Sequence, residues 1–381
     1  MYVGFAATGV ALTIPGAILP LLLRRWSMSD ARGGLLLFCF YAVGSLGSYS
    51  ARGRMNRSLA RGALLSGAGA LCLGWAGPWS AYGAIALYGM GLSLTITSIS
   101  LLQSQRFPAE RRLEMTRLNL IWAMGAAVGP WIALRSTRIG LVSEAQEIAH
   151  AQSVLVGVAV FFVIGTAWAM WVETSPARVA AAAIERRGAE GIPWQLLVLI
   201  FGATGVEAAA AGWLTSYAQR AGDSLGITIG AATFLWVGSL VSRTVHSTKW
   251  AARLPERAVL ATSMAATTAA LALLIAWPAG IVTMIAAGLL GLAAGPVYPL
   301  VVAAALRHRE NPTVFAIAGV GASILPLATG AMSTWAHSLR AGLAIPLAVA
   351  AVMVGVVAMS GRVLRGKSEA ETEAMLAAAE S

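Results

Sequence analysis

Residues Phe201–Tyr217, FGATGVEAAAAGWLTSY, carry no charge except one carboxylate at Glu207. Together with the apolar residues before it, this run is long enough to cross a bilayer as a helix, which takes about 20 residues. A charged group at bilayer depth costs at least ~2.5–3.5 kcal/mol, so it normally faces a partner or a water-filled cavity. The stretch predicts a membrane-spanning helix with a functional acid at its centre.

The composition of the whole chain predicts an integral membrane protein. Of the 381 residues, 58% are hydrophobic and only 11% are charged, whereas about a quarter of the residues of a soluble protein are charged. Loops on the cytoplasmic side of a membrane explain the excess of 27 Lys and Arg over 16 Asp and Glu. We therefore expect a lipid bilayer, and no nucleic acid, as the partner.

Metal, disulfide and nucleotide chemistry have no support in the sequence. Cys39 and Cys72 both lie inside apolar runs, which favours neither a metal site nor a disulfide framework. The sequence contains no P-loop motif for nucleotide binding. We expect no cofactor and no metal.

Windows of about 20 apolar residues predict an all-α membrane protein with twelve transmembrane helices. Turns near Pro78 and Pro278 divide two very long apolar stretches into pairs of spans. The predicted spans are 4–23, 33–50, 59–77, 80–104, 116–135, 152–173, 193–218, 225–247, 257–277, 279–306, 313–333 and 338–361.

Basic residues are distributed unequally between the predicted loops. If the N-terminus is cytoplasmic, most of the 27 Lys and Arg residues fall on the cytoplasmic side, as the positive-inside rule requires. We therefore expect a multi-pass protein of the cell membrane with both termini in the cytoplasm. The chain then comprises an N-terminal six-helix bundle (1–173), a cytoplasmic linker (174–192), a C-terminal six-helix bundle (193–365) and a cytoplasmic tail (366–381).

An internal repeat supports this division into two bundles. The fifth predicted span contains GAAVGP at Gly125–Pro130, and the eleventh contains GASILP at Gly321–Pro326, about half a chain length later. Two homologous bundles related by an axis along the membrane normal would produce this spacing, with a substrate bound between them near the midplane. The Gly-Pro pairs at Gly129–Pro130 and Gly295–Pro296 either bend or unwind their helices or are tolerated, because Pro removes one helical hydrogen bond.

Four motifs, in order along nearly the whole chain, resemble those of the major facilitator superfamily and, within it, the fucose-permease-like sugar transporters. They are TRLNLIWAMGAAVGP at Thr116–Pro130, GVEAAAAGWLTSY at Gly205–Tyr217, GSLVSR at Gly238–Arg243 and GPVYP at Gly295–Pro299. The resemblance implies two pseudo-symmetric six-helix bundles that rock about a central site. It also implies a monomeric secondary transporter for a small neutral hydroxylated solute.

Two positions depart from the pattern of these transporters. The loop after their second span usually reads GxLaDRxGRR, whereas Gly47–Arg54 reads GSYSARGR and lacks the Asp. The sugar-permease relatives also carry acids in spans 1 and 4 that take part in proton coupling. Here span 1 has no acid, and Leu94–Ser100 in span 4 reads LTITSIS. Glu207 is then the only candidate proton carrier.

We expect Glu207 to couple transport to protons or to bind the substrate, because a positioned carboxylate can bind and release a proton. One alternative is a static acid that is hydrogen-bonded within its bundle. Another is an acid paired with Arg117 or Arg243, although both arginines lie nearer the cytoplasmic ends of their spans.

Other polar and aromatic residues complete the candidate site. Asn119 and Trp122, near the start of span 5, offer hydrogen bonds and a flat apolar face to a sugar ring, with helix packing as the alternative. The candidate substrate-binding or coupling residues are Glu207, Asn119, Trp122, Trp213, Tyr217, Trp236, Tyr298 and Gln103, and the candidate gating residues are Arg117, Arg243 and Arg54.

Other functions stay open at this point. The chain is also compatible with a drug or metabolite exporter, with a facilitator that is not coupled to protons, and with a non-transporting membrane sensor or assembly protein. An enzyme is disfavoured, because no His-Glu metal set or Ser-His-Asp arrangement falls within the predicted spans.

Overall fold

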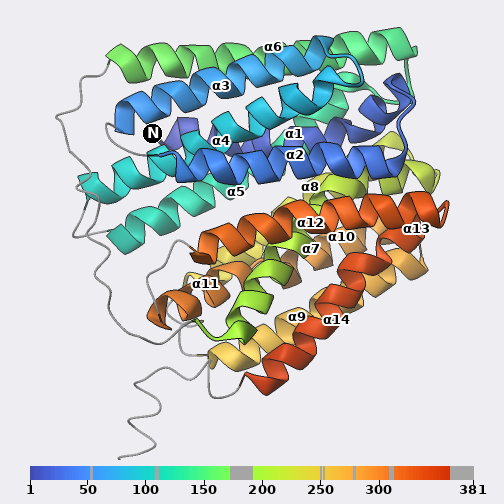
Figure 1. Ribbon diagram of the computed structural model, residues 1–381. Helices are drawn as coiled ribbons and strands as arrows, with labels where there is room; N and C mark the ends of the chain where they lie inside the picture. Colours follow the sequence, from blue (N-terminus) through green and yellow to red (C-terminus); the bar gives the residue numbers. More distant parts are fainter. Residues whose placement is uncertain are drawn as a thin grey trace, which may run out of the picture.

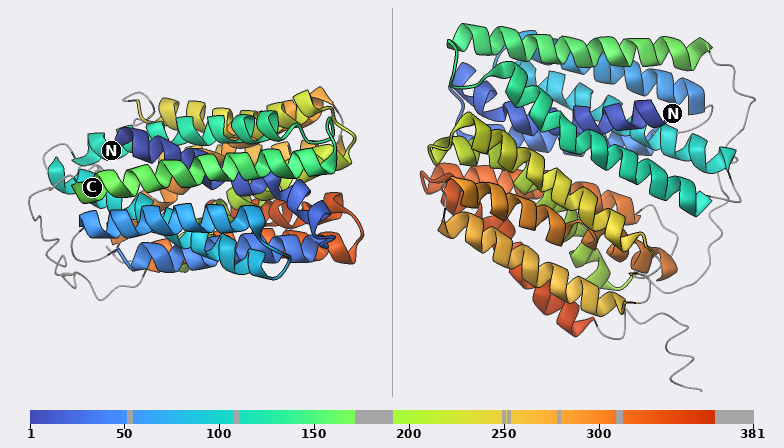
Figure 2. Two further views of the ribbon diagram at one scale, coloured as in Figure 1. Left: turned by 90° about the horizontal axis from the view of Figure 1, so that it is seen from above. Right: turned by 180° about the vertical axis from the view of Figure 1, so that it is seen from behind.

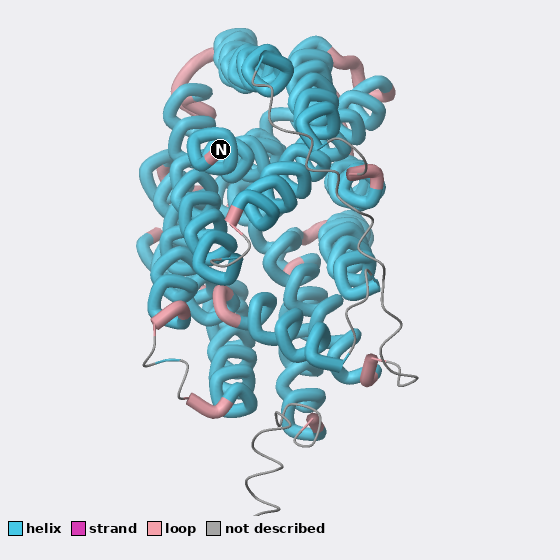
Figure 3. The backbone as a smooth tube through the Cα atoms, turned by 90° about the vertical axis from the view of Figure 1, so that its left-hand side faces the viewer, coloured by secondary structure: helices cyan, strands magenta, loops and turns pink. Residues whose placement is uncertain are grey.

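The computed structural model describes residues 1–51, 55–107, 111–171, 192–248, 251, 254–277, 280–308 and 313–360. Within these ranges the chain forms fourteen α-helices and no strand (Figure 1). Figure 3, seen from the end of the molecule that carries the N-terminus, shows most of the helices nearly end-on. This arrangement is expected in lipid, because every backbone group must be bonded within its own segment.

The helices of the first half are α1 (Tyr2–Arg25), α2 (Asp30–Tyr49), α3 (Met55–Trp75), α4 (Ser80–Arg106), α5 (Arg111–Thr137) and α6 (Glu144–Trp171). Those of the second half are α7 (Trp194–Arg220), α8 (Leu225–His246), α9 (Glu256–Ala276), α10 (Ile281–Ala294), α11 (Val297–His308), α12 (Thr313–Trp335), α13 (Leu339–Gly342) and α14 (Ala344–Met359).

Twelve membrane spans result from these fourteen helices, as predicted. Helices α10 and α11 together form one span over Ile281–Ala305, and α13 and α14 form another over Leu339–Met359. Ten spans in the described part of the chain are long and apolar enough to cross a bilayer. The other two, α3 and α5, carry arginines near their first turns and pack against α4 and α1 respectively. The chain is a multi-pass membrane protein.

The structure corrects the predicted start of the sixth span. Helix α6 begins at Glu144, eight residues before the predicted position of 152. Its first turn carries Glu144 and Glu147, which the positive end of the helix dipole favours. Glu147 is also buried against Arg24, so the polar start of α6 is stabilised by packing that hydropathy does not register.

The two Gly-Pro pairs behave differently. Helix α5 continues through Pro130, so this proline is tolerated without a break. At Gly295–Pro296 the helix is interrupted, and α10 ends at Ala294 while α11 begins at Val297. Of the two alternatives that the sequence left open, tolerance describes the first pair and an interrupted helix the second.

Helices α1–α6 lie in one half of the molecule and α7–α14 in the other (Figure 1), and the view from behind shows the same division (Figure 2). The two halves meet where α2 packs on α12, α5 on α8, and α1 on α7. Small residues permit close approach at these contacts, as is usual between membrane helices. A Cβ on Gly16 would lie 2.5 Å from the carbonyl oxygen of Ala211, and one on Gly34 would lie 2.9 Å from that of Pro326.

The two ends of the molecule differ in the burial of α7 and α5. We call the end with the loops 26–29 and 221–224 the outer end, and the opposite end the inner end, following the predicted orientation. Toward the outer end of α7, every residue from Gly212 to Ala218 is buried. At the inner end, Arg117 and Asn119 of α5 are exposed. Helix α7 is therefore enclosed at its outer end, whereas α5 is partly exposed at its inner end.

Candidate functional site

Glu207, at the middle of α7, is paired with an arginine of the neighbouring helix α8. Nη2 of Arg243 donates to Oε1 of Glu207 at 3.0 Å and to Oε2 at 3.4 Å. The side chain of Glu207 is 19% exposed and that of Arg243 is 14% exposed. A buried acid is tolerated when an opposite charge neutralises it. Of the alternatives considered for Glu207, the pairing with Arg243 is the one found.

Arg243 also connects this pair to other helices. Its Nε lies 3.4 Å from the carbonyl oxygen of Gly295, at the interruption between α10 and α11. Its guanidinium lies 5.7 Å from the ring centroid of Trp122 on α5, within the range of a cation–π interaction. Arg243 therefore contacts both halves of the molecule, although the sequence suggested a position nearer the inner end.

Two tryptophans meet across the halves beside this pair. The rings of Trp122 on α5 and Trp236 on α8 pack edge to face, with centroids 5.7 Å apart. Tyr298, at the start of α11, lies close enough to interact electrostatically with both Glu207 and Arg243. We call Glu207, Arg243, Trp122, Trp236 and Tyr298 the central cluster.

A tyrosine that sequence reasoning missed also belongs near this cluster. Tyr41 of α2 lies within electrostatic range of Glu207. Its only signal in the sequence is a phenol in the middle of an apolar span, which does not distinguish it from a packed aromatic residue.

A narrow cavity adjoins Glu207 between α7, α8 and α10. It lies within the second half of the molecule, and its wall is mostly apolar. The lining residues are Val206, Glu207, Ala210, Leu235, Trp236, Ser239, Leu290, Gly291 and Ala294.

Two candidates on α7 lie outside the central cluster. Trp213 is fully buried, and its Nε1 donates to the carbonyl oxygen of Pro326 on α12 at 3.0 Å. Tyr217 is buried about one turn before the end of α7, and its hydroxyl donates to the carbonyl oxygen of Leu274 on α9 at 2.7 Å. Both side chains have partners toward the outer end, and neither lines the cavity beside Glu207. Their assignment to substrate binding stays a prediction.

Three more candidates, Gln103, Arg117 and Asn119, lie at the inner end. Two of them bind Glu114, an acid that was not among the candidates. Glu114 is buried and accepts hydrogen bonds from Gln103 at 2.6 Å, from Tyr2 at 2.5 Å and from Arg117 at 2.5 Å. These contacts join α1, α4 and α5 within the first half. Asn119 is exposed, and its amide donates to the carbonyl oxygen of Met115 in its own helix.

Gln103 and Asn119 therefore do not contact Glu207 in this structure, and their role in substrate binding stays a prediction. Arg117 lies at the inner end, where a gating residue was expected. Hydropathy placed the start of span 5 at 116, which left the buried acid Glu114 outside the span and unnoticed. The candidate gating residue Arg54 lies outside the described residues.

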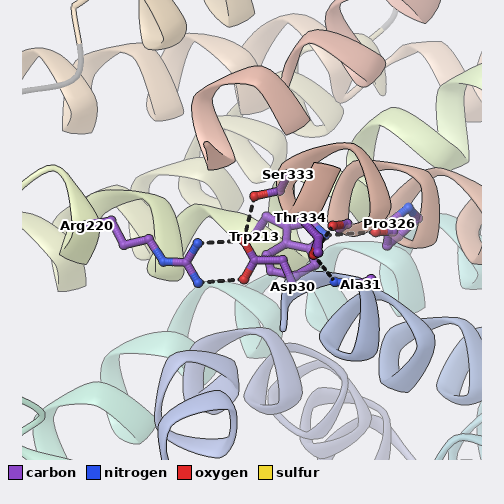
Figure 4. Close-up of polar contacts among 8 residues, drawn as sticks. Asp30, Ala31, Trp213, Arg220, Pro326, Ser333 and Thr334 are labelled. Atoms are coloured by element: carbon purple, nitrogen blue, oxygen red, sulfur yellow. Dashed lines mark hydrogen bonds and ion pairs between the residues drawn. The ribbon is translucent and has the colours of Figure 1, made fainter. Parts of the chain in front are cut away.

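The outer end contains an ion pair that joins the two halves (Figure 4). Asp30, the first residue of α2, accepts two hydrogen bonds of 2.6 Å from the guanidinium of Arg220, the last residue of α7. Ser333 of α12 donates to the same carboxylate at 2.5 Å. We call Asp30, Arg220 and Ser333 the outer latch.

Two further hydrogen bonds support the latch. The backbone N–H of Ala31 donates to Oγ1 of Thr334 on α12 at 2.8 Å, and the bond from Trp213 to Pro326 lies in the same region (Figure 4). Gly330 of α12 has no room for a Cβ, which would lie 2.8 Å from the ring of Trp213. Helices α2, α7 and α12 are therefore closely packed here.

Neither models of protein families nor the curated proteins gave a match to this sequence. Solved structures do match. A bacterial homologue of the human lysosomal transporter Spinster, inward-facing and unoccupied, is similar with a TM-score of 0.73 at 13% identity, over 95% of this chain and 96% of that one. The nucleoside transporter NupG has a TM-score of 0.67 at 12% identity, over 96% and 99% of the two chains.

A third similar structure is the fucose:proton symporter of E. coli, with a TM-score of 0.57 at 15% identity over 93% of this chain and 96% of that one. Another structure of that symporter, in the outward conformation, is described as a major facilitator superfamily transporter. This chain has the major facilitator fold.

The major facilitator fold places the central cluster and the outer latch at different depths of one interface between the bundles. The sequence did not predict the outer latch, because Asp30 precedes the predicted span 33–50 and Arg220 follows the predicted span 193–218. Neither residue was therefore among the candidates. A usable signal was an acid and an arginine next to spans on the same predicted side of the membrane, and 190 residues separate them in the chain.

Proposed function

We propose that this protein is a secondary transporter that moves a small hydroxylated solute across the cell membrane by alternating access. The ion pair of Glu207 and Arg243 beside the tryptophan pair carries this proposal. Intramembrane ion pairs are costly and mark solute or proton pathways. The major facilitator fold of the chain supports the same function.

The central cluster has the chemistry that a hydroxylated ring requires. Glu207 accepts hydrogen bonds from hydroxyl groups, and Arg243 donates to hydroxyl oxygens. Trp122 and Trp236 provide apolar faces for the ring carbons. Because these two tryptophans belong to different bundles and pack on one another, a solute that binds beside the pair and touches both rings contacts both bundles. Its binding can therefore bias how the bundles are arranged.

Glu207 also couples transport to protons in this proposal. When Glu207 is ionised, it holds Arg243 at 3.0 Å. A proton on the carboxylate removes its charge and frees the guanidinium to bind solute oxygens. Proton binding and solute binding then favour one another, which makes the protein a symporter.

The structure corresponds to an inward-facing state in this proposal. The contacts of the outer latch close the outer end, and the similar Spinster homologue is itself described as inward-facing. The outer end faces the outside of the cell, both termini lie in the cytoplasm, and the protein acts as a monomer.

Uptake into proteoliposomes under an imposed pH gradient tests the proposal. Wild type should accumulate a monosaccharide such as fucose against its gradient, and Glu207→Gln should equilibrate the solute at most. Glu144→Gln, an exposed acid at the start of α6, is the matched control and should behave as wild type. Full proton-driven accumulation by Glu207→Gln would exclude the coupling role.

The mostly apolar wall of the cavity favours a second candidate, an exporter of drugs or metabolites. In that case amphiphilic compounds, and no sugar, would raise the melting temperature of the purified protein, because a ligand of the folded state stabilises it. Transport that occurs without any pH dependence would instead identify a facilitator. The absence of transport of every solute would favour a sensor or an assembly protein.

A further inference from the structure

The cavity beside Glu207 contains a buried hydroxyl group without a partner. Ser239 of α8 lines this cavity and is only 4% exposed, and its Oγ makes no hydrogen bond within the described part of the chain. Burying a hydroxyl without a hydrogen bond is unfavourable, and such groups in native proteins require an explanation.

Several other buried hydroxyls in the membrane spans bond to their own helix. Ser66, Ser323 and Thr329 each donate to the carbonyl oxygen four residues earlier. Within the described residues, the buried hydroxyls that share the unpartnered state of Ser239 are those of Ser98, Ser216, Thr228, Thr267 and Thr283, but none of these lines the cavity beside Glu207. For Ser239 the equivalent acceptor is the carbonyl of Leu235. That carbonyl is packed so closely under Gly291 of α10 that a Cβ at this glycine would collide with it. The hydroxyl of Ser239 makes no such bond within the described residues and is available to the cavity.

The position of Ser239 on its helix places it between two members of the central cluster. Trp236, Ser239 and Arg243 follow one another at spacings of three and four residues, so they share one face of α8. Glu207 lines the same cavity from α7. Its hydrogen bonds within the described residues come from a single nitrogen of Arg243, and a carboxylate can accept more than two.

The ion pair determines the charge of a group that fits here. Arg243, 3.0 Å from Glu207, repels a cation, and the carboxylate of Glu207 repels an anion. The remaining wall consists of small or apolar residues. A neutral group that can both donate and accept hydrogen bonds is therefore the best complement to this cavity.

We infer that Ser239 is a specificity-determining residue that binds a hydroxyl group of the solute. The ligand class is a neutral molecule with adjacent hydroxyls, such as the diol edge of a monosaccharide. One hydroxyl donates to Glu207, and its neighbour exchanges a hydrogen bond with Ser239. This inference rests on the proposed function, because it assigns the solute to the same central site.

Ser239→Ala tests the inference in purified protein, with monosaccharides including fucose as probes and thermal stability measured against probe concentration. Loss of one neutral hydrogen bond should weaken the affinity roughly three- to tenfold. The melting temperature without a probe should stay the same or rise, because the variant removes an unsatisfied buried hydroxyl. A merely structural role of Ser239 would instead lower it.

Ser216→Ala is the matched control. Ser216 of α7 is 1% exposed and its Oγ is also without a partner in the described residues, but it does not line the cavity. Its variant should bind the probe as wild type does, and Ser239→Thr, which keeps a hydroxyl, should restore at least part of the affinity. Deoxy probes locate the ligand group: the analogue that lacks the bound hydroxyl should lose affinity for wild type but not for Ser239→Ala.

The outcomes separate this inference from the proposed function. If a monosaccharide stabilises wild type and Ser239→Ala binds it with the same affinity, the central site stands and the role of Ser239 is overturned. If no monosaccharide stabilises wild type, the hydroxyl assignment is overturned as well. A selective loss in Ser239→Ala, absent in Ser216→Ala, supports the inference even if proton-driven accumulation is not observed.

Discussion

The outer latch should hold the two bundles together at the outer end, and Asp30→Asn tests this directly. The substitution keeps the shape of the side chain but removes the charge that accepts two 2.6 Å bonds from Arg220 and one from Ser333. The latch joins α2 of the first bundle to α7 and α12 of the second. Its loss should therefore shift the protein from the outer-closed toward the outer-open arrangement.

The size of the shift follows from the exposure of the pair. The side chain of Asp30 is 9% exposed and that of Arg220 is 47% exposed. Hydrogen bonds to charged groups contribute about 1.5–3 kcal/mol, whereas exposed ion pairs contribute at most ~1 kcal/mol. With one partner half exposed, we expect a cost of about 1–2 kcal/mol, which changes the ratio of closed to open molecules by a factor of roughly 5–30.

Cysteine accessibility measures this ratio. Leu37 of α2 is buried against Gly212 of α7, so Leu37→Cys reports on opening of the outer half. Cys39 and Cys72 would be replaced by Ser, and a membrane-impermeant maleimide would be added from outside. The cysteine should react roughly 5–30 times faster in Asp30→Asn than in the otherwise wild-type protein, if opening precedes the reaction and is brief.

A second ion pair at the outer end provides the control. Arg24 and Glu147 are joined at 2.5 Å with similar exposures of 46% and 5%, but both belong to the first bundle. Glu147→Gln should leave the reaction rate at Leu37→Cys unchanged. Exchanging the partners of the latch, as Asp30→Arg with Arg220→Asp, should restore much of the protection. An unchanged rate in Asp30→Asn would refute the latch.

Two further predictions concern the buried contacts of Trp213 near the outer end and of Glu114 near the inner end. Trp213→Phe keeps a ring against α2 but removes the 3.0 Å hydrogen bond to Pro326. Loss of this bond, at ~1 kcal/mol, should raise the maleimide reaction rate at Leu37→Cys about fivefold. This factor is at the lower end of the range expected for Asp30→Asn. Glu114→Gln leaves Tyr2 and Gln103 with a neutral partner in a buried site. The melting temperature of the protein should therefore fall, while stabilisation by fucose persists. An unchanged melting temperature would show that these contacts of Glu114 do not stabilise the first bundle.

Much of the membrane architecture follows from local sequence properties. Length and hydropathy predict the twelve spans, because each helix must satisfy its own backbone in lipid whatever its neighbours are. For Gly295–Pro296 the sequence left a bent or unwound helix and simple tolerance open, and the structure has an interrupted helix. Glu207 was identified for the same local reason, since a charge inside an apolar run is conspicuous before any partner is known.

The assignment of side chains to one site depended on information that is not local. Spans that are apolar on all sides give no periodicity from which the face toward the other bundle could be read. Trp122 and Trp213 therefore looked equivalent, yet Trp122 meets Trp236 in the central cluster and Trp213 bonds to Pro326 near the outer end.

The sequence by itself determined that the chain crosses the membrane and that an acid lies within it, because both are properties of single helices. Only the tertiary structure decided that this acid is held by Arg243, and that Asp30 meets Arg220 across 190 residues of chain. The physical reason is that hydropathy determines the depth of a residue in the bilayer. Its rotational position and its partners are determined by how small residues let the helices pack.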